Sequence, residues 1–73
     1  MNVAYVEHAL KGNVRTYVRV YSPKDGKKRQ WASITAQQSP NHAKLIKIIA
    51  GAINSGEICT QDEATEMKMR LIG

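Results

Sequence analysis

Apolar and polar residues alternate most clearly in residues 14–21, and this alternation predicts a β-strand with two different faces. Successive side chains of a strand point to opposite sides, so one set can be buried while the other stays open. The set expected to be buried is Val14, Thr16, Val18 and Val20, and the set expected to be open is Arg15, Tyr17, Arg19 and Tyr21.

Weaker strand patterns lie on both sides of this segment. Residues 3–10 mix β-branched and aromatic residues, and the Lys11-Gly12-Asn13 segment that follows is typical of a turn. Residues 22–27 contain Pro23 and an Asp25-Gly26 pair, which predict a hairpin loop. Residues 29–35 are then expected to form the returning strand, and their sequence leaves its register open.

The second half of the chain has the spacing of apolar residues that is typical of helices. Ser39 and Pro40 predict the start of the first helix, as cap and first helical residue, and Gly56 predicts its end. Its expected apolar face consists of Leu45, Ile46, Ile48, Ile49, Ala52 and Ile53. Thr60 and Glu63 match a capping box and predict a second helix that continues to about residue 72, with Ala64, Met67 and Leu71 on one side.

These elements predict an α+β fold with the order β-β-β-α-α. We expect a three-stranded antiparallel sheet packed on one helix, at residues 40–55, followed by a short C-terminal helix. With 73 residues, the chain is expected to form a single small domain. Residues 1–36 would form the basic sheet and residues 39–73 the helical layer, while the second face of the sheet stays open.

Charge distribution adds a functional expectation. The whole net charge of +5 lies within residues 1–38, because basic and acidic residues balance in residues 39–73. A positive charge concentrated on one structural unit indicates a polyanionic partner. Arginine binds phosphate or guanine, and tyrosine stacks on bases or donates to phosphate. The predicted binding residues are Arg15, Tyr17, Arg19, Tyr21, Lys24, Lys27, Lys28 and Arg29.

Two segments, residues 12–21 and residues 25–31, resemble the arm-type DNA-binding domain at the N-terminus of phage tyrosine recombinases. The resemblance covers residues 3–50. It implies a three-stranded sheet backed by a helix and inserted into the DNA major groove. It also implies a reading strand with Arg15, Tyr17 and Arg19, and a basic turn and third strand with Lys27, Lys28 and Arg29.

The chain departs from that family at two points. Residues 32–39 lengthen the connection between the third strand and the helix, and no recombinase catalytic domain follows. A stand-alone accessory factor of a mobile element would fit these departures, and so would an unrelated small phage-type protein with the same simple topology.

The leading functional hypothesis is a small DNA-binding protein of phage or mobile-element type that contacts duplex DNA through the open face of its basic sheet. The alternative is a small phage-type inhibitor, such as an anti-defence protein, that binds and blocks a host protein or nucleoprotein complex through the same face. An enzyme is not expected, because the sequence shows no phosphate-cradling glycine loop and no nucleophile beside a base.

Several single residues have competing interpretations. We favour Trp31 as an anchor under the helix, with a stacking platform on the open face as the alternative. His8, His42 and Cys59 match no zinc spacing, so neither a metal nor another cofactor is expected. We expect His42 on the surface of the first helical turn, and Cys59 packed or half-buried.

The sequence also bears on the location of the protein and on a possible helix–turn–helix motif. No apolar run approaches the roughly 20 residues that span a bilayer. The first residues lack the pattern of a signal peptide, and a single cysteine forms no internal disulfide, so we expect a cytoplasmic protein. A helix–turn–helix in residues 40–72 is disfavoured, because Asp62, Glu63 and Glu66 would repel DNA phosphates.

Overall fold

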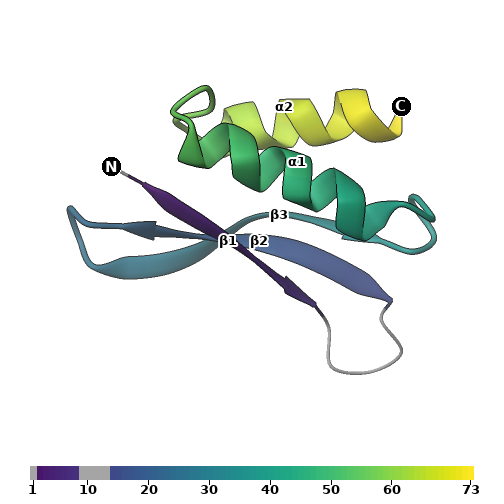
Figure 1. Cartoon of the computed structure of the whole chain (residues 1–73), viewed down its shortest axis with the longest axis horizontal. Coiled ribbons are helices and arrows are strands. Elements are labelled where there is room, and N and C mark those ends of the chain that lie inside the picture. The colour runs from purple at the N-terminus through teal and green to yellow at the C-terminus, as the bar shows by residue number, and fades with distance from the viewer. Residues whose placement is uncertain (1, 9–13) are drawn as a thin grey trace.

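A computed structural model describes residues 2–8 and 14–73 of the chain. Three strands, β1 (Val3–His8), β2 (Arg15–Ser22) and β3 (Lys27–Thr35), precede two helices, α1 (His42–Asn54) and α2 (Gln61–Ile72). The strands form one antiparallel sheet in the order β1-β2-β3, and both helices lie on the same side of it (Figure 1). The predicted α+β fold and element order are confirmed. The end of the predicted first strand and the turn at residues 11–13 lie outside the described residues.

The helical layer is wider than the sequence indicated. α1 packs against all three strands, and α2 lies beside α1 and contacts β3 (Figure 1). Ala64 of α2 is fully buried, and Met67 and Leu71 pack against the core, as the spacing predicted. Two helices rather than one therefore cover the same face of the sheet, and the described helices leave the other face uncovered.

The core lies between the sheet and α1. Its largest fully buried apolar side chains are Val18, Val20, Ile34, Ile46 and Ile49. Two residues that the sequence placed on buried faces are exposed instead. Val14 precedes β2 and is 55 % exposed, and Ile48 is 45 % exposed because it lies on the side of α1 that points away from the sheet.

A β-bulge at Trp31 decides which side chains of β3 face the helices. Val18 pairs with Ala32, but the next residue of β2, Arg19, pairs with Gln30, so Trp31 is the extra residue. A bulge of this kind re-aims a side chain relative to the regular alternation. Trp31 is half-buried and packs against the core on the helix side, next to the buried Ala32. The interpretation that we favoured for Trp31 thus agrees with the structure.

α1 begins later than the sequence indicated. His42 is its first residue, and Asn41 is the N-cap without a capping side-chain hydrogen bond. The hydroxyl of Ser39 instead accepts a hydrogen bond of 3.1 Å from the backbone N–H of Asn41, which closes a turn ahead of the helix. The other two helix-end signals are confirmed: Gly56 has a positive φ of 83° after α1, and Thr60 forms its capping box at α2.

A chain of hydrogen bonds joins β1, β2 and α1, and it is buried at Thr16 and His42. Thr16 Oγ1 lies 2.7 Å from His42 Nδ1 and 3.1 Å from His8 Nδ1. Thr16 is 0 % exposed and His42 is 7 % exposed, so the prediction of a surface position for His42 was wrong. Because Thr16 reaches the first turn of α1, it supplies the partner that a buried imidazole requires.

Thr16→Val should lower the free energy of unfolding by about 1–3 kcal/mol, although valine preserves the shape of the side chain, because the buried imidazole would lose its partner. Urea unfolding of the variant measures this loss. In a His42→Leu background the same change should cost much less, since no buried imidazole is then left without a partner and the exposed His8 can bond to water instead. Equal losses in the two backgrounds would show that the hydrogen bond is not the cause.

Candidate nucleic-acid interface

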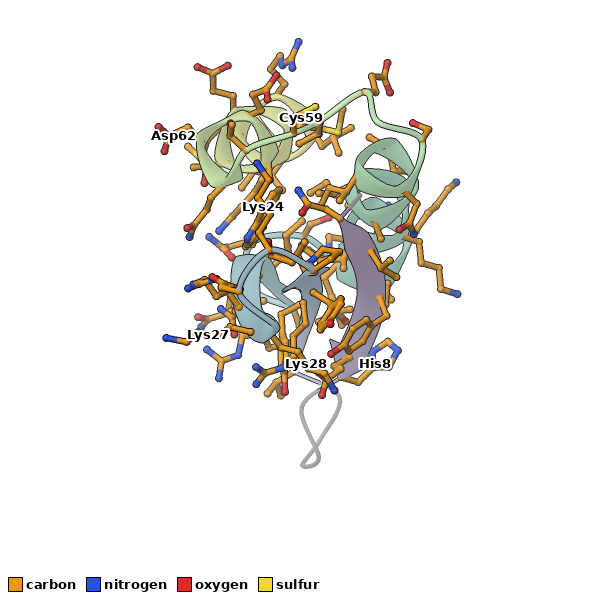
Figure 2. All side chains as sticks on the ribbon, turned by 90° about the vertical axis from the view of Figure 1, so that its left-hand side faces the viewer. His8, Lys24, Lys27, Lys28, Cys59 and Asp62 are labelled. Carbon is orange, nitrogen blue, oxygen red and sulfur yellow. The ribbon has the colours of Figure 1, made fainter. Side chains whose placement is uncertain are left out.

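The sheet face opposite the helices, called the open face below, carries all three tyrosines of the chain. Cross-strand pairing arranges its side chains in four rows. Figure 2 views the molecule with the helices at the top and Lys28 at the lower, uncovered side of the sheet. The rows are Val3, Tyr21 and Lys28; Tyr5, Arg19 and Gln30; Glu7, Tyr17 and Ser33; and Arg15 with Thr35.

The alternation in β2 positions the centre of the open face. Thr16, Val18 and Val20 are buried under the helices, which forces the intervening residues to the other side. Arg15 is exposed, and Tyr17, Arg19 and Tyr21 are half-buried. Apart from Val14, the residues predicted for the buried face and for the open face of this strand therefore lie on those faces in the structure.

Arg19 is held in place by its neighbours on the open face. Its Nε lies 2.6 Å from Glu7 Oε1, and its Cζ lies 5.5 Å from the centroid of the Tyr17 ring. Both members of the ion pair are more than a third exposed, so the pair contributes little to stability. Its effect is to orient the guanidinium, whose five N–H donors exceed what one carboxylate contact uses.

Sequence reasoning missed Glu7 as a member of this face. The sequence did contain a signal for it, because Glu7 is two residues after Tyr5 in β1, and side chains two residues apart in a strand point to the same side. Its diagonal contact with Arg19 depends on the register between β1 and β2, which the sequence does not state.

The remaining cations of the open face are Lys28 and Arg15. Lys28 Nζ lies 5.7 Å from the centroid of the Tyr5 ring, so a side chain of β3 reaches across the face to one of β1 in a cation–π contact. Within residues 2–8 and 14–73, no ion pair involves Arg15. Arg15 is therefore an exposed cation at one end of the face, and Lys28 lies toward the other end.

The structure does not bring all eight predicted residues together. Arg15, Tyr17, Arg19, Tyr21 and Lys28 share the open face. Arg29 pairs with Val20 across the strands, so it lies on the helix side, and Lys24 lines a pocket on that side too. Lys27 lies at the outer edge of β3, as Figure 2 shows.

Asp25 closes the hairpin loop between β2 and β3, next to these cations. Its Oδ1 accepts a hydrogen bond of 2.9 Å from the backbone N–H of Lys27, and its Oδ2 lies 2.8 Å from Arg29 Nη1. The Lys27 N–H, and next the Arg29 guanidinium, hold the pKa of Asp25 below its ordinary value of 3.8. Gly26 supplies the positive φ of 68° that the predicted turn requires.

Residues 2–8 and 14–73 contain no group of three or more His, Cys, Asp or Glu side chains that could hold a metal ion. Cys59 lies in the connection between α1 and α2 and is exposed, so the expectation of a packed or half-buried thiol was wrong. Its thiol donates to the Gly56 carbonyl over 3.4 Å. In the part of the chain that the structure describes, no helix has both the length and the apolar character needed to cross a membrane.

Comparisons of the chain with protein-family models, with curated proteins and with solved structures found no match.

Proposed function

We propose that the protein is a small DNA-binding protein of phage or mobile-element type that contacts duplex DNA through the open face. The observation that carries this proposal is the gathering of Arg15, Arg19 and Lys28 with three tyrosines on a face that the described helices leave uncovered. Three strands about 4.8 Å apart measure about 10 Å between the outer two. That width matches a B-DNA major groove about 12 Å wide.

The rows of the open face contain side chains that can contact DNA phosphates and side chains that can contact base edges. Arg15 and Arg19 can each bind a phosphate or the O6 and N7 atoms of guanine. Gln30, in the same row as Arg19, has the carboxamide that pairs with adenine, and the tyrosine hydroxyls can donate to phosphates. This chemistry is that of a binding protein rather than an enzyme. We place its action in the cytoplasm, where an exposed thiol such as that of Cys59 stays reduced.

The negative charge of Glu7 would repel a polyanion, and its ion pair with Arg19 reduces this repulsion. It is the one acid among the described residues of the open face. Its carboxylate is neutralised by Arg19 in the free protein. On binding, the guanidinium of Arg19 would share its donors between Glu7 and a phosphate or base.

Duplex binding should weaken steeply as the salt concentration rises. If Arg15, Arg19 and Lys28 each neutralise one phosphate, log K should fall with log salt concentration with a slope of about −2.7. Fluorescence anisotropy with a labelled random duplex at several salt concentrations measures the slope. A slope near zero, or no duplex binding at low salt, would contradict the proposal.

A second candidate is an inhibitor that blocks a host protein or nucleoprotein complex. It is favoured by the composition of the open face, because tyrosine and arginine are enriched among the residues that dominate protein interfaces. The same anisotropy titration separates the two functions. An inhibitor of this kind would leave random duplex unbound and would form a stable complex with its protein target.

A further inference from the structure

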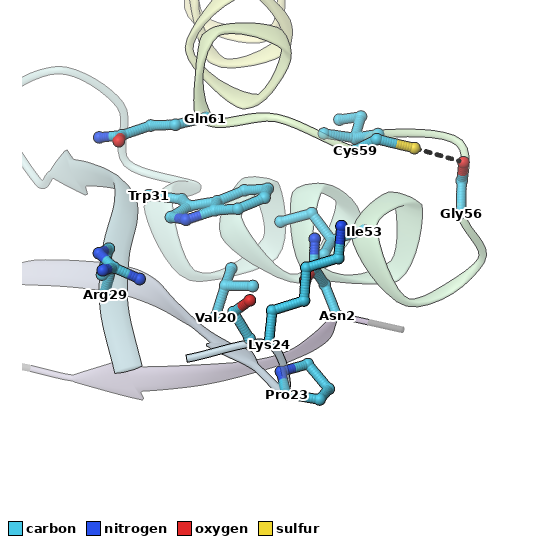
Figure 3. A pocket seen from close by; sticks show the side chains of 12 residues that line it. Asn2, Val20, Pro23, Lys24, Arg29, Trp31, Ile53, Gly56, Cys59 and Gln61 are labelled. Carbon is cyan, nitrogen blue, oxygen red and sulfur yellow. Dashed lines mark hydrogen bonds between the residues drawn. The ribbon is translucent and has the colours of Figure 1, made fainter. Parts of the chain in front are cut away.

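A pocket of about 580 Å³ opens on the helix side of the sheet (Figure 3). It lies between the β2–β3 hairpin, the start of β1 and the connection from α1 to α2. Its volume falls within the range of small-molecule sites. Its apolar lining consists of Val20, Trp31, Ile53 and Ile58 together with the ring of Pro23.

The charges of the pocket have one sign. Among the described residues that line it, Lys24 and Arg29 are cations and none is an acid. In Figure 3, Lys24 extends from the hairpin loop toward the side of Ile53, and Arg29 lies beside Trp31. Arg29 uses Nη1 for Asp25, which leaves further donors of its guanidinium for a ligand. The pocket therefore favours an anionic ligand.

Trp31 gives the pocket a planar aromatic wall. The bulge in β3 turns this half-buried indole to the helix side, where it lines the pocket with the two cations (Figure 3). Any base can stack on an aromatic side chain, because every base has a flat aromatic face. Gln61 and Asn2 add carboxamide groups that can bond to the edge of a base.

We propose that this pocket binds a nucleoside phosphate, with the base against Trp31 and the phosphate held by Lys24 and Arg29. The ligand is either a free mononucleotide or an unpaired nucleotide at the end of a strand, and both present the same chemistry. The site uses none of the side chains of the open face, so it is independent of the proposal for duplex DNA.

Trp31 is the only tryptophan of the chain, so its fluorescence reports on this pocket alone. Titration with adenosine monophosphate should quench it in a saturable way. Adenosine and ribose 5-phosphate should each bind at least about tenfold more weakly, because each lacks one of the two recognised groups, and 1.4 kcal/mol corresponds to tenfold. No saturable quenching by the nucleotide at about 1 mM, the concentration of a weak site, would overturn the proposal. Adenosine binding as tightly as its phosphate would also overturn it.

Variants of two neighbouring lysines localise the effect. Lys24→Ala should weaken nucleotide binding about tenfold, as expected for one lost charge-assisted bond. Lys27 lies three residues further along the chain and does not line the pocket. Lys27→Ala removes the same charge and should leave nucleotide binding unchanged. Equal effects of the two variants would overturn the assignment. The double variant Arg15→Ala, Arg19→Ala should keep the quenching, so a failure of the duplex proposal can be told apart from a failure of this one.

A comparison of ligands identifies the source of the nucleotide. A duplex with one unpaired terminal nucleotide that quenches Trp31 at lower concentration than adenosine monophosphate supports a strand end, and the reverse order supports a free nucleotide. Saturable quenching by a short acidic peptide, with none by either nucleotide ligand, would overturn the proposal in favour of a protein partner.

Discussion

Replacing both Arg15 and Arg19 with alanine should weaken duplex DNA binding by about 100-fold or more and leave the melting temperature nearly unchanged. Each hydrogen bond from a charged group contributes about 1.5–3 kcal/mol, and each 1.4 kcal/mol corresponds to tenfold in affinity. Both side chains lie on the open face and neither belongs to the core, and substitutions at such positions rarely shift stability. Anisotropy with a labelled duplex and a thermal melt by circular dichroism measure the two quantities.

Two control variants test whether position or only charge is responsible. Lys44→Ala combined with Lys47→Ala removes the same net charge from exposed positions of α1, on the other side of the molecule, and should have a much smaller effect. Glu7→Gln should tighten duplex binding, because it removes the acid that competes for Arg19. A larger loss from the lysine pair than from the arginine pair would make α1 the binding element.

Ile49→Ala should lower the free energy of unfolding by about 2–4 kcal/mol. Ile49 is 0 % exposed between α1 and the sheet, so the truncation leaves a cavity in the centre of the core. Small domains are stable by about 5–15 kcal/mol, and the expected loss is a large part of that. Urea unfolding monitored by circular dichroism measures it.

The adjacent residue provides the matched control. Ile48 is 45 % exposed, so Ile48→Ala deletes the same atoms from the same helix without emptying a buried site. Its effect should stay within about 0.5 kcal/mol. Equal losses from the two variants would show that α1 does not face the sheet as described.

The features that the sequence predicted correctly depend on neighbours along the chain. The alternation in β2 sets which residues are buried, and the signals at Gly26, Gly56 and Thr60 act within a few residues of themselves. For this reason the element order and most of the open face could be predicted without knowledge of the tertiary contacts.

The features that the sequence did not predict depend on how separate elements meet. The pair of Glu7 and Arg19 requires the register of β1 on β2, and burial of His42 requires Thr16 to lie beneath the first turn of α1. Neighbouring residues of a strand point to opposite sides, and the bulge in β3 decides that Arg29 faces the helices and Lys28 the open face. The positive charge of residues 1–38 therefore lies on two surfaces, the open face and the helix side of the sheet, although the sequence presents it as one cluster.

The bulge also bears on how the chain can change in length. Trp31 has no partner in the register, and the residues on either side of it, Gln30 and Ala32, pair with consecutive residues of β2. Deletion of Trp31 would therefore leave an unbroken ladder with the same residues on each face. The aromatic wall of the pocket can be gained or lost by a single codon insertion or deletion while the opposite face keeps its composition. Evolution can thus alter one surface of this small sheet without disturbing the other.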